Sequence, residues 1–289
     1  MKVAIIGGSG RMGQWFARLL IKEGREVVIT GRNQKKLVAV GKQLGVEVAT
    51  NTEAVKDADV ILLSVPIDNL EEVVKQISPH IQPKQVIVDI TSIKVFPVEV
   101  MHKYLKSGLI LGMHPMFGPG ANDIANQNFV LTPTSDDEQV LAEKVRGYLE
   151  SKGARVTLMT PEEHDTMVAI TLGLSHFIAI TSADALLSLD KSGKMGLMGG
   201  STYRLLRVLI ESVLSEDPEL YASLQMSLPG IAEIEKLFQK SAWKWAEVVA
   251  SKDRQKFVDG MNALKDKLNQ LDPDFGKSYE KMYKIVEGL

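Results

Sequence analysis

The sequence predicts an α/β domain built on a doubly wound parallel sheet, followed by an all-helical domain. Over the first 160 residues, short runs of β-branched and aliphatic residues alternate with longer amphipathic stretches, a pattern typical of a parallel sheet covered by helices. Beyond residue 160 the chain reads as one helix after another. We therefore predict a first domain over residues 1–160 and a second over residues 161–289.

Seven apolar runs in the first domain are predicted strands. They are KVAII (2–6), EVVIT (26–30), VILLSV (60–65), VIVDI (86–90), LILGM (109–113), FVLTP (129–133) and ARVTLM (154–159). The near-continuous hydrophobicity of VILLSV indicates a strand that is buried on both faces. Between the first two runs, RMGQWFARLLIKEG carries apolar residues at helical spacing, and Gly24 is expected to end that helix.

The second domain opens with a long helix. Thr160 is the predicted N-cap, Pro161 the first helical residue, and Glu163 completes a capping box. The helix continues to residue 189 with Gly173 as its only breaker. We expect DKSGKMGLMGG, residues 190–200, to be a mobile segment. Further helices are predicted over residues 202–215, 217–226, 230–250 and 253–271, with a last short helix after them.

Composition narrows the function classes. A formal net charge of −2 gives no electrostatic argument for binding nucleic acid or a membrane surface. The chain has no cysteine, and its five histidines show no metal-ligand spacing, so we expect no metal site. No stretch approaches 18 uninterrupted apolar residues, and MKVAIIGG is too short for a signal peptide. These features predict a soluble cytoplasmic protein.

The long apolar helix also bears on oligomeric state. Such a helix, followed by a small helical bundle, often buries its surplus apolar face against a second subunit. We therefore expect a homodimer formed through the helical domain. A monomer whose helical domain is well covered is the alternative.

A glycine-rich loop follows the first predicted strand. Gly8, Gly10 and Gly13 match G-x-G-x-x-G between a strand and an amphipathic helix, which is the context of a dinucleotide fingerprint in a Rossmann-like sheet. We expect Gly8 to permit the tight turn, Gly10 to let the backbone approach the phosphates, and Gly13 to let the helix lie close to the strand. The helix N-terminus would then face the pyrophosphate. The loop contributes six candidate cofactor-binding residues: Gly8, Ser9, Gly10, Arg11, Met12 and Gly13.

The end of the second strand favours NADP over NAD. An NAD site normally has Asp or Glu here, whereas this chain has Thr30 and Gly31 followed by Arg32. A guanidinium can bind a 2′-phosphate through two hydrogen bonds, and Lys35 and Lys36 add positive charge. The alternative is that Arg32 is a solvated residue at the start of the next helix.

The carboxyl ends of three further strands carry candidate site residues, because ligands of open α/β sheets bind at that edge. Ser64, Val65 and Pro66 follow one strand and would line the ribose–nicotinamide side of the cofactor. Ser92 follows the next strand and His114 the one after it.

A neutral imidazole at the position of His114 can accept the proton of a substrate hydroxyl while hydride leaves the adjacent carbon. Ser92 could orient that ring or bond the same hydroxyl. A structural role, with the ring bonded to a loop carbonyl, is the alternative for His114. The sequence surroundings of His80, His102 and His164 favour structural or solvated histidines.

Together these motifs resemble a known family. GGSGRMG, VDITSIK, GMHPMFGP and the helical LGLSHF are similar to the prephenate/arogenate dehydrogenases of tyrosine biosynthesis, in their compact microbial form without a fused mutase or regulatory domain. The resemblance spans nearly the whole chain, and HPMFGP is its most specific element. It implies a nucleotide-binding domain joined to a helical dimerisation domain.

The resemblance also implies a reaction. Hydride passes from C4 of prephenate to NAD(P), the C4 hydroxyl becomes a carbonyl, and the ring carboxylate is lost as carbon dioxide. His114 would accept the hydroxyl hydrogen bond with Ser92 as its partner. The dianionic substrate would be bound in the helical domain by His176 and by Arg204 or Arg207. The sequence departs from the family at Ser212, where the main substrate-binding arginine is expected.

Other readings remain open. A β-hydroxyacid dehydrogenase would place a lysine on the long helix, and residues 161–189 contain none. A deazaflavin-dependent NADP reductase would lack the HPMFGP loop and a long helical domain. An NADP-sensing protein without catalytic activity would have no need of His114 and Ser92 at the strand ends.

Overall fold

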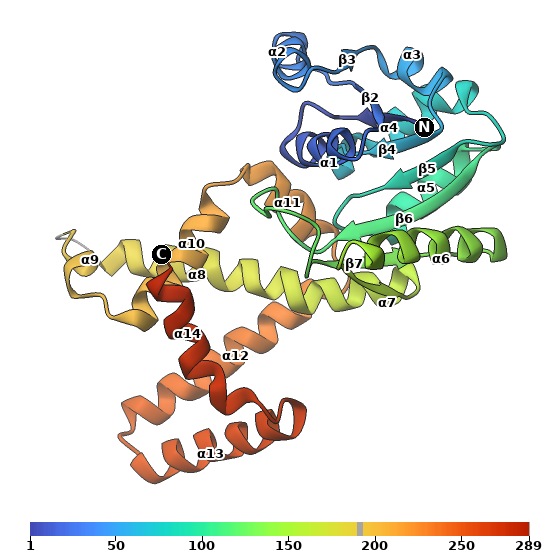
Figure 1. Ribbon diagram of the computed structural model, residues 1–289. Helices are drawn as coiled ribbons and strands as arrows, with labels where there is room; N and C mark the ends of the chain where they lie inside the picture. The colour runs from blue at the N-terminus through green and yellow to red at the C-terminus, as the bar shows by residue number, and fades with distance from the viewer. Residues whose placement is uncertain (190–192, 289) are drawn as a thin grey trace. The chain divides into compact units, whose positions relative to one another are not determined.

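The computed structural model describes residues 1–189 and 193–288, and the chain forms two compact units. The first unit is Met1–Val168, and the second begins at Ala169. Figure 1 shows the first unit as a sheet with helices on both of its faces.

An eight-stranded sheet forms the centre of the first unit, with the order β3-β2-β1-β4-β5-β6-β7-β8. Its strands are β1 (Lys2–Ile6), β2 (Glu26–Ile29), β3 (Glu47–Val48), β4 (Val60–Leu63), β5 (Val86–Asp89), β6 (Leu109–Pro115), β7 (Asn128–Thr132) and β8 (Arg155–Leu158). The first six strands are parallel, in the order of the dinucleotide-binding fold. β7 is antiparallel to β6 and β8 is parallel to β7, so the last two strands run in the opposite direction.

The predicted parallel sheet is therefore confirmed for β1 to β6, while the last two strands depart from it. β3 was not expected, because it has only two residues and both are exposed. One register row crosses the sheet through Ile6, Leu63, Asp89 and Gly112, so the carboxyl ends of β1, β4, β5 and β6 share one edge.

Seven α-helices and one 3₁₀ turn complete the first unit. They are α1 (Arg11–Lys22), α2 (Gln34–Leu44), α3 (Asn51–Lys56), α4 (Ile67–Ile77), η1 (Ser78–His80), α5 (Val95–Tyr104), α6 (Asp136–Ser151) and α7 (Pro161–Val168). β1 shows how the two layers arise. Val3 and Ile5 pack with residues of α1, α2 and α6, whereas Ala4 and Ile6 pack with residues of α3, α4 and α5. Burial on both faces explains why such strands are apolar throughout.

All regular elements among the described residues of the second unit are helices or helical turns. Its elements are the π-helical turn η2 (Ala169–Gly173), α8 (Leu174–Leu189), α9 (Met195–Met198), α10 (Ser201–Leu214), α11 (Pro218–Ser227), α12 (Ile231–Ala250), α13 (Arg254–Leu271), η3 (Phe275–Lys277) and α14 (Ser278–Glu287). The predicted helices agree closely with these bounds. Of the segment expected to be mobile, residues 190–192 lie outside the described residues, and α9 forms within the remainder.

The long helix begins as predicted. Glu163 donates its backbone N–H to the Thr160 hydroxyl, and the Thr160 N–H donates to the Glu163 carboxylate, which completes the capping box. The helix runs over Pro161–Leu189 and changes to π-helical geometry at η2. By length and composition it could cross a membrane, a test that core helices of soluble proteins also pass. A methyl group on Gly173 would lie 2.7 Å from the Ile231 side chain, so this glycine permits close approach of α12.

Candidate active site

The glycine loop joins β1 to α1 with little space to spare. Gly7 has a φ of +87°, and a Cβ there would lie 2.2 Å from the carbonyl oxygen of Ser64. The left-handed residue of the tight turn is thus Gly7 rather than Gly8. Gly8 is required for a different reason, because its Cβ would lie 2.6 Å from the Ile29 side chain.

Gly13 has the role that the spacing predicts. A Cβ on this residue would lie 2.7 Å from both the Gly7 carbonyl oxygen and the Gly8 Cα, so only glycine lets α1 lie this close to the loop. At Gly10 a Cβ would meet only the Gly7 oxygen, at 3.1 Å.

The N-terminus of α1 suits an anionic group. Gly10 is its N-cap, and no described side chain caps it; its first turn contains no acidic residue. Free amide groups at a helix N-terminus favour phosphate. Arg11 is exposed, Met12 is half-buried, and Ser9 is buried beside Gly31. The loop therefore fits the pyrophosphate of a dinucleotide.

The end of β2 carries no acid. The Thr30 hydroxyl donates to Asn51 Oδ1 at 2.6 Å and accepts the Gly7 N–H at 3.3 Å, which fastens it to the loop. Arg32 is exposed and forms no ion pair with a described residue. Its guanidinium and the exposed Lys35 and Lys36 on α2 give the segment after β2 a positive charge.

The segment after β4 lies directly against the glycine loop. The Ser64 carbonyl closes on Gly7, and the Ser64 N–H donates to the Ile6 carbonyl at 2.8 Å. Val65 is half-buried, and the exposed Pro66 is the N-cap of α4. The structure thus brings Ser64, the first residue of the predicted group Ser64–Pro66, against the loop.

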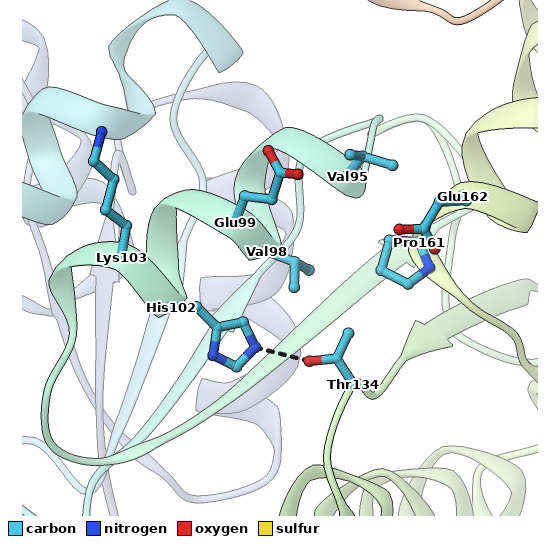
Figure 2. A pocket seen from close by; sticks show the side chains of 8 residues that line it. All are labelled: Val95, Val98, Glu99, His102, Lys103, Thr134, Pro161 and Glu162. Carbon is cyan, nitrogen blue, oxygen red and sulfur yellow. Dashed lines mark hydrogen bonds between the residues drawn. The ribbon is translucent and has the colours of Figure 1, made fainter.

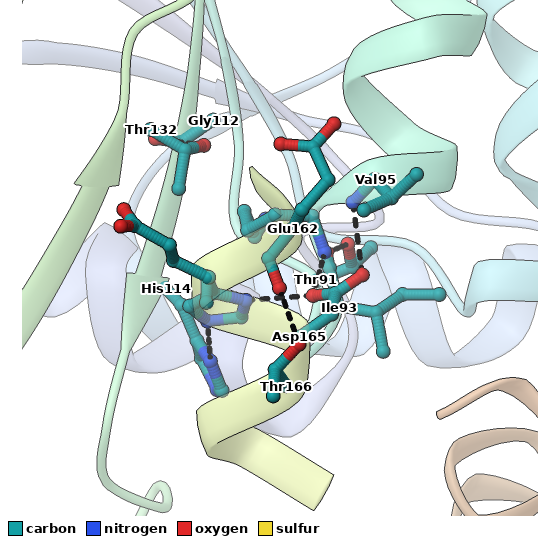
Figure 3. A network of polar contacts seen from close by, with 12 residues as sticks. Thr91, Ile93, Val95, Gly112, His114, Thr132, Glu162, Asp165 and Thr166 are labelled. Atoms are coloured by element: carbon teal, nitrogen blue, oxygen red, sulfur yellow. Dashed lines mark hydrogen bonds and ion pairs between the residues drawn. The ribbon is translucent and has the colours of Figure 1, made fainter. Parts of the chain in front are cut away.

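His114 lies near the carboxyl end of β6 and is only 5% exposed. β7 borders it, since His114 is in register with Val130. Its Nδ1 lies 2.8 Å from Nε2 of His164, on α7 (Figure 3). Burial lowers the pKa of His114 well below its usual range, and the nearby His164 ring and Lys94 ammonium lower it further. The ring is therefore neutral at pH 7.

His164 is in turn bonded to its neighbour Asp165. The His164 Nδ1 lies 2.7 Å from Asp165 Oδ1. The same carboxylate accepts the backbone N–H of Lys94 at 2.7 Å and that of Val95 at 3.0 Å, so it caps the N-terminus of α5 from another helix (Figure 3). A chain of hydrogen bonds thus runs from α5 through Asp165 and His164 to His114.

A buried ion pair adjoins this chain. The Lys94 ammonium pairs with Asp89, and both side chains are fully buried. Asp89 also accepts the Thr91 N–H at 2.9 Å. Burial lowers the pKa of Lys94, while the Asp89 carboxylate opposes that shift.

Ser92 lies half-buried in the turn between β5 and α5. Its hydroxyl forms no hydrogen bond with any residue that the structure describes, whereas the Nδ1 partner of His114 is His164. His114 Nδ1 is thus bonded to His164 and not to Ser92. A role for Ser92 in bonding the substrate hydroxyl stays a prediction.

The loop after β6 is fastened to the helix that follows the glycine loop. The indole N–H of Trp15, on α1, donates to the Ala121 carbonyl at 2.7 Å. The Phe117 ring lies edge-on between Trp15 and Phe129, with centroid distances of 4.9 and 5.3 Å. The HPMFGP segment is therefore held by α1 and β7.

The first unit also has a separate hollow of about 450 Å³. Figure 2 shows the side chains that line it. It is lined by Val95, Val98, Glu99, His102, Lys103, Thr134, Pro161 and Glu162. His102 bonds the Thr134 hydroxyl at 2.7 Å and pairs with Glu138, which is a structural role. None of the described lining residues is a predicted site residue. The lining carries two carboxylates and one ammonium, so its charge favours neither an anionic nor a cationic ligand.

The three predicted substrate residues belong to the second unit. His176, on α8, packs edge-on against Tyr221 with ring centroids 4.6 Å apart, and its buried Nδ1 has no partner among the described atoms. On α10, Arg204 donates to the Val286 carbonyl at 3.2 Å, and Arg207 pairs with Glu211 at 2.6 Å. Both arginines thus have partners within their own unit.

Ser212 is on α10 as well, and its hydroxyl donates to the Leu209 carbonyl at 2.9 Å. It therefore has an ordinary helix-surface hydrogen bond.

The glycine loop, the strand order and the α1 N-terminus, which no described side chain caps, define a nucleotide-binding domain of the Rossmann class. The comparisons agree. The model of the prephenate dehydrogenase nucleotide-binding domain matches residues 16–158, and that of the prephenate dehydrogenase dimerization domain matches residues 160–263. The chain belongs to the prephenate dehydrogenase family.

Individual relatives extend this result. A probable arogenate/prephenate dehydrogenase of Methanocaldococcus jannaschii is 37% identical over 262 residues, which cover 89% of this chain and 59% of that protein. The chain thus spans about three-fifths of that curated relative.

Two solved structures share the fold. The prephenate dehydrogenase from Aquifex aeolicus, in complex with hydroxyphenyl propionate and NAD+, has a TM-score of 0.77 at 21% identity, over 94% of this chain and 98% of that one. Synechocystis arogenate dehydrogenase has a TM-score of 0.68 at 22% identity, over 93% and 100%.

Two residues of the site were missed by the sequence reasoning. His164, expected to be structural or solvated, is 1% exposed and bonded to His114, and Asp165 was not considered. No spacing rule links residues 114 and 164, which lie on a strand and a distant helix. The one available signal was the adjacent His–Asp pair in the first two turns of a capped helix.

Proposed function

We propose that the protein is a prephenate or arogenate dehydrogenase that catalyses an oxidative decarboxylation with NAD(P). The observation that carries this proposal is His114, a buried and neutral imidazole at the carboxyl end of β6 with its Nδ1 already engaged. Family membership supports the same reaction. So does the name of the Methanocaldococcus relative.

His114 has the properties of a proton acceptor. When bound, a nicotinamide dinucleotide supplies the hydride acceptor. His114 Nε2 takes the proton of the C4 hydroxyl as the C4–H bond breaks and the oxygen becomes a carbonyl. The C1–carboxylate bond then breaks, its electrons make the ring aromatic, and the proton returns from His114 to the oxygen. Atoms and charges balance, with carbon dioxide and a phenol as products.

The proposed cofactor is NADP. The exposed Arg32 and the absence of an acid at the end of β2 support it, and an NAD+ complex of the Aquifex relative keeps NAD as the alternative. The residues proposed to hold the dinucleotide are Gly8, Ser9, Gly10, Arg11, Met12, Gly13, Arg32, Ser64, Val65 and Pro66. An Arg32→Gln variant should lose 10- to 100-fold in kcat/KM for NADP and little for NAD, since a charge-assisted bond contributes about 1.5–3 kcal/mol. A wild-type preference for NAD would contradict the assignment.

The helical unit is proposed to bind the dianionic substrate and to form a cytoplasmic homodimer. His176, Arg204 and Arg207 are the proposed substrate residues, with Ser92 on the hydroxyl. The exposed Trp243 and Leu237 on α12, at 71% and 64%, support a covered apolar face, as does the dimerization-domain match. Light scattering at micromolar concentration should give twice the chain mass, and a monomer would contradict the dimer.

One assay tests the activity directly. Reduction of NAD and of NADP is followed at 340 nm with prephenate and with arogenate in four parallel reactions. Turnover with either substrate supports the proposal, and the ratio of kcat/KM values selects the substrate. Dinucleotide binding without turnover of either substrate would instead favour a reductase with another substrate, or a sensor.

A further inference from the structure

We infer that His164 and Asp165 are positioning residues that fix His114 in the tautomer whose Nε2 lone pair is free for a substrate hydroxyl. The inference rests on the proposed function only in naming that hydroxyl. The tautomer itself follows from four hydrogen bonds within the first unit.

Asp165 determines which groups donate and which accept along this series of hydrogen bonds. Its Oδ1 accepts the Lys94 N–H and its Oδ2 accepts the Val95 N–H, so both oxygens are used as acceptors. An ionised carboxylate has no proton to donate. The contact of 2.7 Å between Asp165 Oδ1 and His164 Nδ1 therefore requires the proton to be on the His164 nitrogen.

The position of the proton on His164 then determines which nitrogen of His114 is protonated. A neutral imidazole has one donor and one acceptor nitrogen, so His164 with Nδ1–H has a bare Nε2. That Nε2 lies 2.8 Å from His114 Nδ1, which must donate to it. His114 is left with an unprotonated Nε2, the nitrogen that the reaction needs.

A doubly protonated His164 would reverse this result, because it would donate to His114 Nδ1 and leave the proton on His114 Nε2. Two features disfavour that state. Burial lowers the pKa of His164, although its bond to Asp165 and the nearby Asp89 carboxylate oppose the shift. The ammonium of the fully buried Lys94 also repels a second positive charge.

The arrangement joins the site to the fold. Asp165 caps α5, and Ser92 lies three residues before α5 begins. One carboxylate therefore fixes both the start of the helix behind Ser92 and the tautomer of His114. A carboxylate that orients a histidine, which then orients the reacting group, is a recurrent device in enzyme and metal sites.

Asp165→Asn is the variant that separates positioning from packing. An asparagine side chain keeps the size of the carboxylate. With its NH₂ at the position of Oδ1 it donates to His164 and loses the bond from the Lys94 N–H, while its oxygen, at the position of Oδ2, keeps the bond from the Val95 N–H. The protons on both histidines would then reverse, leaving His114 Nε2 protonated. In a related Asp–His arrangement the same change lowers kcat roughly 10⁴-fold by imposing the wrong tautomer. We expect a loss of roughly 10³- to 10⁴-fold here, with the Kd for the dinucleotide within about threefold of wild type.

The closing experiment reads the tautomer by NMR. Protein labelled with ¹⁵N-histidine, with five histidines in the chain, is examined by two-bond ¹H–¹⁵N correlation at pH 7.5 without substrate. Wild type should show His114 and His164 both protonated on Nδ1, and Asp165→Asn should show both protonated on Nε2. A wild-type His114 protonated on Nε2, or a tautomer unchanged in Asp165→Asn, would overturn the inference.

Two further variants keep the test decisive. If Asp165→Asn does not fold, His164→Leu serves instead, because an alkyl side chain bonds neither Asp165 nor His114, so neither His114 tautomer is selected and the ¹⁵N shifts should move toward an average. Shifts that do not move overturn the inference. Asp137→Asn, on the exposed first turn of α6, is the matched control and should change neither spectrum nor kcat. A wild-type spectrum as expected, without turnover of either substrate, would refute the proposed function and leave the positioning intact.

Discussion

Replacing Gly13 by alanine should destabilise the first unit and weaken dinucleotide binding together. The added methyl group would lie 2.7 Å from the Gly7 carbonyl oxygen and 2.7 Å from the Gly8 Cα. Both are backbone atoms of the loop, so no change of rotamer relieves the overlap. Overpacking of this kind costs about 1–3 kcal/mol. The higher helix propensity of alanine than of glycine offsets about 0.5–1 kcal/mol of this destabilisation.

Gly147, on α6, provides a matched control. It is also a helical glycine, and a Cβ there meets no atom within 4 Å. Gly147→Ala should therefore stabilise the protein by about 0.5–1 kcal/mol. Since both variants gain the same helix preference, the difference between them isolates the overlap at Gly13, about 1–3 kcal/mol.

Thermal unfolding followed by circular dichroism measures this difference, and fluorescence titration with NADPH measures binding. The midpoints of thermal unfolding should differ by about 2–12 °C between the two variants. Gly13→Ala should raise the Kd for NADPH at least about tenfold, which corresponds to 1.4 kcal/mol. Equal stability of the two variants with unchanged NADPH affinity would refute the close-approach argument.

Three further predictions concern the histidine chain and the loop after β6. His114→Asn should lower kcat by several orders of magnitude with little change in KM, because the proton acceptor acts in the transition state. The free energy of unfolding should fall as the pH drops below about 6.5, by up to about 1.4 kcal/mol per pH unit for each of His114 and His164. The reason is that the pKa of both histidines is lowered in the folded protein, so the unfolded chain binds more protons than the folded one. Trp15→Phe should cost about 1–3 kcal/mol by leaving the Ala121 carbonyl without its indole donor, and should speed amide exchange in residues 116–122.

Each of these has its own check. Turnover of His114→Asn close to wild type would remove its proposed role. For the pH series, denaturant titrations of wild type and a His114→Gln variant at pH 7.5, 6 and 5 should show a shallower acid loss in the variant; identical slopes would contradict the lowered pKa. Unchanged exchange in Trp15→Phe would show that the aromatic contacts with Phe117 alone hold the loop.

Much of the fold could be predicted because the strands of the first unit are apolar runs and the helices carry clear start signals. The capping box at Thr160 and Glu163 is local chemistry, and it forms as the sequence indicates. The reversal of β7 and β8 could not be predicted in this way. Strand direction depends on which edge the chain returns to, and the residues of β7 are apolar whichever way it runs.

The site divides along the same line. His114 and the glycine loop are signalled by their position after strands, whereas the partnership of His114 with His164 depends on how α7 folds back onto the sheet. The choice of Gly7 rather than Gly8 for the left-handed turn depends on the Ser64 carbonyl, which arrives from β4. Short-range sequence patterns identify the candidate catalytic and binding residues, whereas long-range packing determines which other residues position them.

The strand order sets a minimum length for the ligand. The glycine loop follows β1 and His114 lies on β6, with β4 and β5 between them. Three strand spacings separate the two positions, roughly 14 Å along the sheet edge. A single phosphate or a small acid could touch one of these positions but not both. A ligand whose charged end lies on α1 must therefore be extended if its other end is to reach a substrate beside β6. The strand order alone thus sets a minimum length for that ligand, whatever side chains line the edge.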